Sequence, residues 1–138
     1  MSLDRISAED ALARLGQFST VIDARSEGEY AEDHLPGAVN WPSLHDDERK
    51  IVGTRYKQIS QFEAKKLGAA LVAKNIADHI QREVLDKPRE WQPLVYCWRG
   101  GKRSGSLALI LDQIGFKVTL VDGGYKAFRA ALVADLPQ

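Results

Sequence analysis

Short apolar segments alternate with segments of helical periodicity along most of the chain, and this alternation restricts the possible folds more than any other feature. Segments 20–23, 38–40, 94–97 and 118–121 are short and contain apolar or β-branched residues, which predicts buried strands. Capping patterns predict helices that begin at Ser7, Ser26 and Ser60, and a further helix is predicted to end at Gly115. Strands that alternate with helices are typical of an α/β fold with a mainly parallel sheet.

Two further regions complete this outline. The apolar residues behind Ser60 predict one long helix that ends before Pro88, and those behind Tyr125 predict a closing helix. Residues 41–60 are charged and show no such periodicity, so we expect them to be irregular. No internal repeat is visible, and we expect residues 1–138 to form a single domain.

The composition is that of a soluble globular protein, with 44% hydrophobic and 28% charged residues. No apolar run approaches the roughly 20 residues of a membrane helix, and the first residues lack the apolar core of a signal peptide, so we expect a cytoplasmic protein without membrane contact. Lys and Arg together number 19, as do Asp and Glu, so the overall charge favours no particular partner. A solvated helix face explains Lys65, Lys66 and Lys74 as well as RNA binding does.

The cysteine and histidine content excludes several kinds of site. Cys97 is the one cysteine, so no disulfide can form within the chain. The three histidines lie far apart without the spacing of metal ligands, so we expect neither a metal nor another cofactor.

The segment around the cysteine carries the main chemical signal. Cys97 ends a predicted strand, and the residues that follow supply three cations and two glycines, namely Arg99, Gly100, Gly101, Lys102 and Arg103. A glycine loop ahead of a helix can direct several N–H groups at one point, and the cations add positive charge, so the segment predicts an anion-binding loop around a reactive, solvent-accessible thiolate. The alternative is that Cys97 packs at the end of a core strand as a small apolar residue. The spacing is not that of a nucleotide P-loop.

Several segments in order along the chain are similar to one known family. Residues 23–25, 29–30 and 34–40 resemble the N-terminal signature of rhodanese-like domains, and Cys97 with its loop, residues 115–116 and residues 122–125 resemble the C-terminal signature. The resemblance implies a rhodanese-like three-layer fold around a mainly parallel sheet. It also implies a persulfide or a selenosulfide on Cys97, formed from a small anionic sulfur or selenium donor that resembles thiosulfate or selenophosphate.

A narrower resemblance involves residues 52–58, 67–69, 75–77 and 96–104, which look like the rhodanese domain of bacterial tRNA 2-selenouridine synthases. That family replaces sulfur by selenium in 2-thiouridine of tRNA, through an S-geranylated intermediate and with selenophosphate as donor. Its full-length members carry a second domain with a P-loop. This chain has none, so the resemblance implies either the N-terminal part of a longer protein or a natural stand-alone version, and tRNA contact would involve the P-loop domain.

Two alternatives to a sulfur or selenium transferase stay open. Five residues separate Cys97 from Arg103, which is the spacing of cysteine phosphatases, including those on a rhodanese fold. A non-catalytic rhodanese-like interaction module is the other alternative.

For the remaining polar and aromatic residues of the signatures, structural roles are expected. Asp23 and Arg25 are expected to hold a loop at a strand end, and His34 to form a structural hydrogen bond. Trp41 and Trp98 are expected to pack at the rim of the site.

Overall fold

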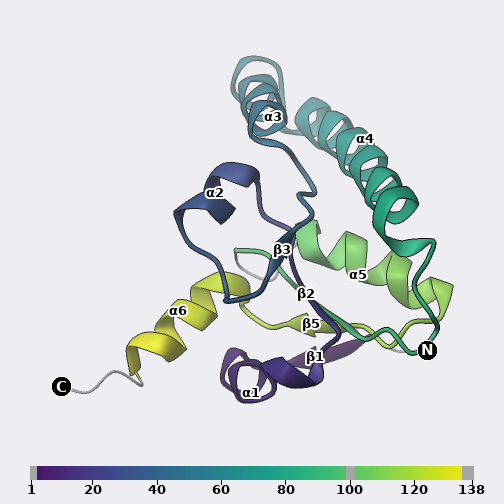
Figure 1. The fold of residues 1–138 in the computed structure, drawn as a ribbon. Helices are drawn as coiled ribbons and strands as arrows, with labels where there is room; N and C mark the ends of the chain where they lie inside the picture. Colours follow the sequence, from purple (N-terminus) through teal and green to yellow (C-terminus); the bar gives the residue numbers. More distant parts are fainter. Residues whose placement is uncertain (1–2, 99–101, 135–138) are drawn as a thin grey trace.

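The computed structural model describes residues 3–98 and 102–134, with side chains for residues 3–98 and 105–132. Five parallel strands form one sheet in the order β1-β5-β4-β2-β3 (Figure 1). The strands are β1 (Asp4–Ile6), β2 (Thr20–Asp23), β3 (Val39–Asn40), β4 (Pro93–Tyr96) and β5 (Thr119–Val121). This arrangement confirms the predicted parallel α/β architecture.

Helices cover both faces of the sheet and complete three layers. They are α1 (Ala8–Ala13), the 3₁₀ turn η1 (Leu15–Gln17), α2 (Glu27–Glu32), α3 (Asp46–Gln58), α4 (Gln61–His79), the π-helical turn η2 (Ile80–Val84), α5 (Lys102–Ile114) and α6 (Gly124–Ala134). One core cluster packs α1 and α6 against the side of the sheet that presents Val21 and Leu94. The other packs α4 and α5 against the side that presents Ile22 and Val95.

The predicted helix starts are confirmed by their caps. The Ser7 hydroxyl accepts a hydrogen bond from the Asp10 amide at 3.1 Å, and the Ser60 hydroxyl accepts one from the Glu63 amide at 3.0 Å. Ser26 opens α2 with a capping box. These contacts satisfy amides that a helix start leaves without partners.

The prediction for residues 41–60 is wrong over most of its length, because α3 occupies residues 46–58. A capping box at His45 and Glu48 begins the helix, its first turn is acidic, and Arg55 and Lys57 lie in its last turn. Most of its residues are exposed, so an apolar stripe is weak and the periodicity that predicts a helix is missing.

Strand β1 was also not predicted. It is three residues long, and only Ile6 of the three is buried. It pairs with β5 in the register of Asp4 with Thr119 and of Ile6 with Val121. A short edge strand with one buried side chain leaves no alternating pattern in the sequence.

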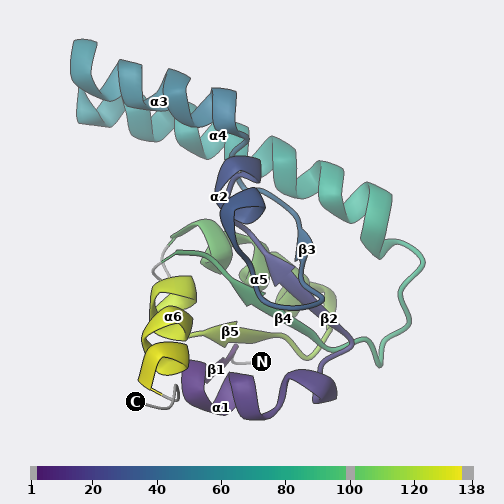
Figure 2. The same ribbon diagram turned by 60° about the vertical axis from the view of Figure 1, so that its left-hand side comes forward.

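Helices α3 and α4 form an antiparallel hairpin, residues 46–79, whose tip extends away from the sheet (Figure 2). Its base is fixed by buried polar contacts. The Asn75 side-chain amide donates to the Glu48 carboxylate at 2.7 Å and to the Ser43 carbonyl at 2.9 Å. His79 donates from Nε2 to the Pro42 carbonyl at 2.7 Å. Burial lowers the pKa of His79 more than this hydrogen bond raises it, so the neutral imidazole is favoured.

Within the described ranges, no helix combines the length and the apolar character that crossing a membrane requires.

Candidate functional site

Cys97 lies directly after β4, the middle strand of the sheet, at the edge formed by the carboxyl ends of the parallel strands. In open α/β sheets this edge is where ligands bind. The residue is only 2% exposed and belongs to the core cluster that also contains Ala24 and, from α5, Leu107. The position at the strand end agrees with the prediction. The thiol was predicted to be solvent-accessible, whereas in the structure it is buried.

The predicted anion-binding loop falls largely outside the described residues. Arg99, Gly100 and Gly101 are not described, and Lys102 and Arg103 are described only as the first residues of α5, without their side chains. Helix α5 begins at Lys102, five residues after Cys97. The roles of these five residues therefore stay predictions.

A second helix N-terminus meets the cysteine segment, and the sequence did not predict it. The Tyr125 amide in the first turn of α6 donates to the Cys97 carbonyl at 2.5 Å, and the Lys126 amide donates to the Trp98 carbonyl at 2.8 Å. Both amides belong to a helix start, where N–H groups lack partners within the helix. The first turn of α6 thus holds the backbone at the point where the cysteine loop begins.

The turn into α6 depends on two glycines. Gly123 and Gly124 have φ values of 76° and 60°, a region that favours glycine. A Cβ atom at Gly123 would lie 2.8 Å from the Cβ of Ala127, which is closer than two carbon atoms can pack. The pair of glycines before Tyr125 was the available signal for this turn, although the sequence alone did not show which carbonyl groups the helix start would meet.

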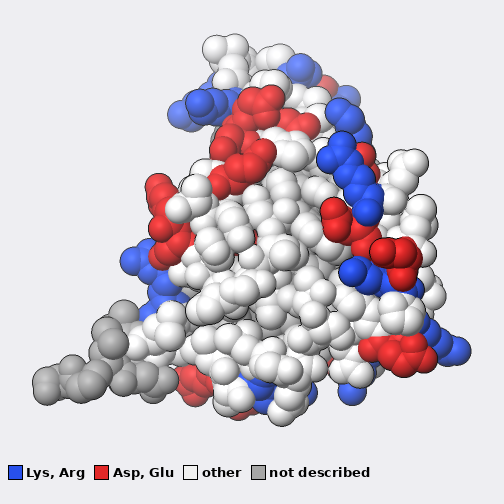
Figure 3. Space-filling model, viewed as in Figure 1, with Lys and Arg blue, Asp and Glu red and all other residues white. Residues whose placement is uncertain are grey.

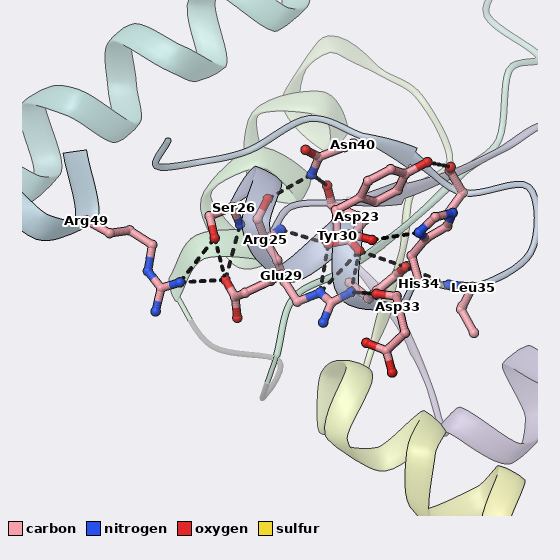
Figure 4. Close-up of polar contacts among 12 residues, drawn as sticks. Asp23, Arg25, Ser26, Glu29, Tyr30, Asp33, His34, Leu35, Asn40 and Arg49 are labelled. Atoms are coloured by element: carbon pink, nitrogen blue, oxygen red, sulfur yellow. Dashed lines mark hydrogen bonds and ion pairs between the residues drawn. The ribbon is translucent and has the colours of Figure 1, made fainter. Parts of the chain in front are cut away.

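A buried ion pair lies beside the cysteine strand, at the end of β2 (Figure 4). The Asp23 carboxylate accepts hydrogen bonds from the Arg25 backbone amide at 2.9 Å, from Arg25 Nε at 3.1 Å and from Arg25 Nη2 at 2.8 Å. The Tyr96 hydroxyl donates to the same carboxylate at 3.0 Å. Asp23 is 0% and Arg25 2% exposed, and the structural role predicted for both residues is confirmed.

Aromatic rings and a carbonyl surround the arginine. The Arg25 guanidinium donates to the Asp33 carbonyl at 2.6 Å and lies 4.1 Å from the centre of the Tyr125 ring. Burial, followed by the charge of Asp23, raises the pKa of Tyr96 far above its usual value. Burial, together with a hydrogen bond to Asp33, also raises the pKa of Tyr125. Arg25 thereby connects the end of β2 to the helix start that holds the Cys97 carbonyl.

The loop between α2 and β3 is held by its own polar contacts. His34 donates from Nδ1 to the Tyr30 carbonyl at 2.7 Å, and its ring stacks on that of Tyr30 at 3.7 Å. Asn40 donates from Nδ2 to the carbonyls of Asp23 and Arg25 at 3.1 and 2.8 Å. The structural hydrogen bond predicted for His34 is confirmed.

The two tryptophans of the signatures take part in packing, as predicted. Trp41 is 6% exposed, and its ring lies 6.0 Å from that of Trp91. Trp98 is half-buried, with its ring 6.2 Å from that of Tyr125. Across the part of the chain that the structure describes, no group of three His, Cys, Asp or Glu side chains could hold a metal ion.

Taken together, the described residues place one thiol at the end of the central strand, in the segment that leads to the N-terminus of α5, and the carbonyls of Cys97 and Trp98 accept from the first turn of α6. A helix N-terminus that follows a cysteine can stabilise negative charge on its sulfur. Asp23 is the carboxylate at the end of the adjacent strand, and its oxygens already accept hydrogen bonds from Arg25 and Tyr96. The site thus contains a thiol and, beside it in the sheet, a carboxylate that is held by hydrogen bonds.

Comparisons with a family model and with curated proteins agree on one family. The model of the rhodanese-like domain matches residues 7–131. The tRNA 2-selenouridine synthase of Nitrosomonas europaea is 36% identical over 132 residues, which cover 95% of this chain and 34% of that protein. The enzyme of the same name from Psychromonas ingrahamii is 38% identical over 118 residues, covering 86% and 32%. The chain spans about a third of the length of these curated relatives.

Solved structures agree with this result. The N-terminal domain of a protein described as ATP/GTP binding, from Clostridium difficile 630, superposes with a TM-score of 0.73 at 33% identity, covering 96% of this chain and 99% of that one. A rhodanese-related protein from Thermoplasma volcanium superposes with a TM-score of 0.60 at 17% identity, covering 98% and 96%, which supports the fold alone.

Proposed function

Because this chain belongs to the family of rhodanese-like domains, we propose that it is a sulfur- or selenium-transferring domain that carries the transferred atom on Cys97. The observation that carries the proposal is the position of the chain's one cysteine, at the end of the central strand and shortly before the N-terminus of α5. Helix N-termini favour a thiolate and the anionic terminal atom of a persulfide. The similarity to tRNA 2-selenouridine synthases supports selenium as well as sulfur as cargo.

With thiosulfate as donor, the proposed reaction has two steps. The Cys97 thiolate attacks the outer sulfur of thiosulfate, a new S–S bond forms, and sulfite leaves with the electron pair of the broken bond. The terminal sulfur of the Cys97 persulfide then passes to a nucleophile such as cyanide, which leaves as thiocyanate and regenerates the thiolate. A donor that delivers selenium would leave a selenosulfide on the same residue. Arg99, Gly100, Gly101, Lys102 and Arg103 are proposed to surround the anionic adduct.

The proposed physiological reaction is the conversion of 2-thiouridine to 2-selenouridine in tRNA. This part rests on the names of the relatives. Since the chain spans about a third of their length, we propose that it supplies the chalcogen-carrying domain, residues 1–138, and that the complete reaction needs the additional sequence that the relatives contain. We also propose that the domain acts in the cytoplasm, where tRNA is modified.

A cysteine phosphatase is the alternative raised by the spacing of Cys97 and Arg103, and the surroundings argue against it. A phosphatase usually needs a carboxylic acid that protonates the leaving oxygen. Asp23, on the neighbouring strand, is 0% exposed, and its carboxylate accepts hydrogen bonds from Arg25 and Tyr96. A persulfide carrier needs no such acid, because sulfite leaves without a proton.

A non-catalytic interaction module is favoured by one observation, the 2% exposure of Cys97. The two functions differ in whether the thiol reacts.

Incubation with thiosulfate followed by intact-mass measurement should show an adduct one sulfur atom heavier on the wild type and none on Cys97→Ser. Thiosulfate:cyanide sulfurtransferase activity should depend on the same residue, and aryl phosphate hydrolysis should be weak. A thiol that takes up neither sulfur nor iodoacetamide would favour the interaction module, and Cys97-dependent phosphate release without a persulfide would favour the phosphatase.

A further inference from the structure

Positive charge is concentrated in one projecting part of the molecule. The chain as a whole has 19 cations and 19 acids, yet residues 49–74 contain seven cations and a single acid, Glu63. These residues form most of α3 and the first part of α4, and therefore include the tip of the hairpin. In Figure 3, Lys and Arg side chains line the region of α4, whereas acidic side chains gather near α2 and the start of α3. The seven cations are Arg49, Lys50, Arg55, Lys57, Lys65, Lys66 and Lys74.

Few of these charges are neutralised within the domain. Arg49 pairs with Glu29 at 2.9 Å, and Lys66 pairs with Glu63 at 2.9 Å. Among the described residues, the other five cations form no ion pair. The acids at the start of α3 lie at the base of the hairpin, where Asp46 accepts from the Gly28 amide at 2.9 Å. Cations that form no ion pair and lie on a projecting element attract polyanions.

Exposed aromatic side chains accompany these cations. Tyr56 near the end of α3 is 55% exposed, and Phe62 at the start of α4 is 67% exposed. The Lys66 ammonium lies 5.0 Å from the centre of the Phe62 ring. Proteins that bind unpaired nucleotides combine cations for the phosphates with aromatic rings on which bases stack. The tip of the hairpin has both kinds of group.

A hollow between the hairpin and α5 adds room for a base. Its volume is about 540 Å³, which lies in the range of small-molecule sites. Its lining is mostly apolar and includes Val52, Tyr56, Val72 and Ile110, and among the residues whose side chains are described Lys65 is the charged member. An unpaired nucleotide matches this combination, since its flat base is apolar on both faces and its phosphate is anionic. An acidic peptide would instead bring charged side chains to an apolar lining, so the hollow favours nucleic acid.

We propose that the α3–α4 hairpin carries an RNA-binding surface, which contacts phosphates through Lys50 along α3 and through Lys57 and Lys65 near the tip, and an unpaired base through Tyr56. The choice of RNA among nucleic acids rests on the proposed function. The surface itself is an addition to that function, because it belongs to the hairpin and involves no residue of the cysteine segment. The proposal also differs from the expectation that tRNA contact would involve another domain.

Binding of a fluorescein-labelled tRNA transcript to the 138-residue chain tests the surface by fluorescence anisotropy over a series of salt concentrations. The hairpin variant Lys50→Gln/Lys57→Gln/Lys65→Gln should bind at least tenfold more weakly than the wild type at low salt. It should also lower the slope of log K against log salt by about 2, since each phosphate contact contributes about 0.7–0.9. The matched control Arg14→Gln/Arg89→Gln/Lys117→Gln removes the same charge from exposed positions outside the hairpin, and its slope should stay close to that of the wild type.

The aromatic contribution is tested by Tyr56→Leu, which keeps an apolar side chain and removes the ring. This variant should bind tRNA about tenfold more weakly and bind a fully paired RNA duplex as the wild type does, because a duplex offers no unpaired base. Equal losses in the hairpin and control variants would overturn the proposal, as would the absence of tRNA binding or tighter binding of poly-glutamate than of tRNA. The binding measurement involves no sulfur chemistry, so the two proposals can fail separately. RNA binding without persulfide formation would refute only the proposed function, and persulfide formation without RNA binding would refute only the RNA-binding surface.

Discussion

The buried pair of Asp23 and Arg25 gives the sharpest stability prediction, through the variant Asp23→Ala. The substitution removes a carboxylate that accepts hydrogen bonds from Arg25 and from the Tyr96 hydroxyl. Arg25 stays in place because its guanidinium also donates to the Asp33 carbonyl and lies against the Tyr125 ring. The variant therefore contains a cation that is 2% exposed and has lost its counter-charge.

The size of the effect follows from this burial. Removing one partner of a buried ion pair costs about 3–5 kcal/mol of unfolding free energy. The remaining contacts of Arg25 place the expectation near the lower end, at about 3–4 kcal/mol. The unfolding entropy of a domain of 138 residues is about 0.3 kcal/mol/K, so the midpoint of thermal unfolding should fall by about 10–14 °C.

Thermal and urea unfolding of matched variants measure the effect. Arg5 and Asp122 form an exposed pair at 3.5 Å, with side chains 57% and 58% exposed, so Asp122→Ala should cost less than about 1 kcal/mol. The double variant Asp23→Leu/Arg25→Met removes both charges and should recover most of the loss of the single variant. The reasoning is refuted if Asp23→Ala costs no more than Asp122→Ala, or if the double variant is as unstable as Asp23→Ala.

Three further predictions concern other parts of the fold. Gly123→Ala should cost about 1–3 kcal/mol of unfolding free energy, because φ at Gly123 is positive and an added Cβ would clash with Ala127. The control Gly16→Ala, where an added Cβ meets no atom within 4 Å, should be nearly neutral in the same urea titration. The pKa of His79 is lower in the folded than in the unfolded state, so the wild type should lose stability relative to His79→Gln as the pH falls below about 6.5. Unfolding free energies of the two proteins that run parallel against pH would contradict this. Asn75→Ala should cost about 1–3 kcal/mol of unfolding free energy and speed amide hydrogen exchange in α3, because the buried Glu48 carboxylate loses a hydrogen-bond donor. Unchanged exchange in α3 would refute this role of Asn75.

Much of the fold could be predicted because the relevant signals are local. Strand β2 ends at Asp23 as predicted, and the caps at Ser7 and Ser26 depend on residues within one helical turn. Strand β4 could be predicted from its apolar residues, and with it the position of Cys97 at a strand end. These features need no information from distant parts of the chain.

The parts that were not predicted depend on distant contacts. Helix α3 is stabilised by its caps and by packing along α4 rather than by an apolar stripe, and Cys97 is buried in a core cluster that is assembled from distant segments. The hydrogen bond from the Tyr125 amide to the Cys97 carbonyl joins residues whose proximity only the folded sheet creates. Sequence patterns do not show which residues such contacts pair, so the contacts that hold the cysteine segment could be identified only from the structure.

The pairing of β1 with β5 has a consequence for the order of events during folding. Ile6 lies opposite Val121, so β1 has no partner in the sheet until β5 has been synthesised. Closing so long a loop is entropically costly, and contacts of such sequence separation form slowly. We expect β2, β3 and β4 to associate first and β1 to join the sheet only with β5. The isolated first helix and strand would therefore be the last part of the nascent chain to become resistant to protease.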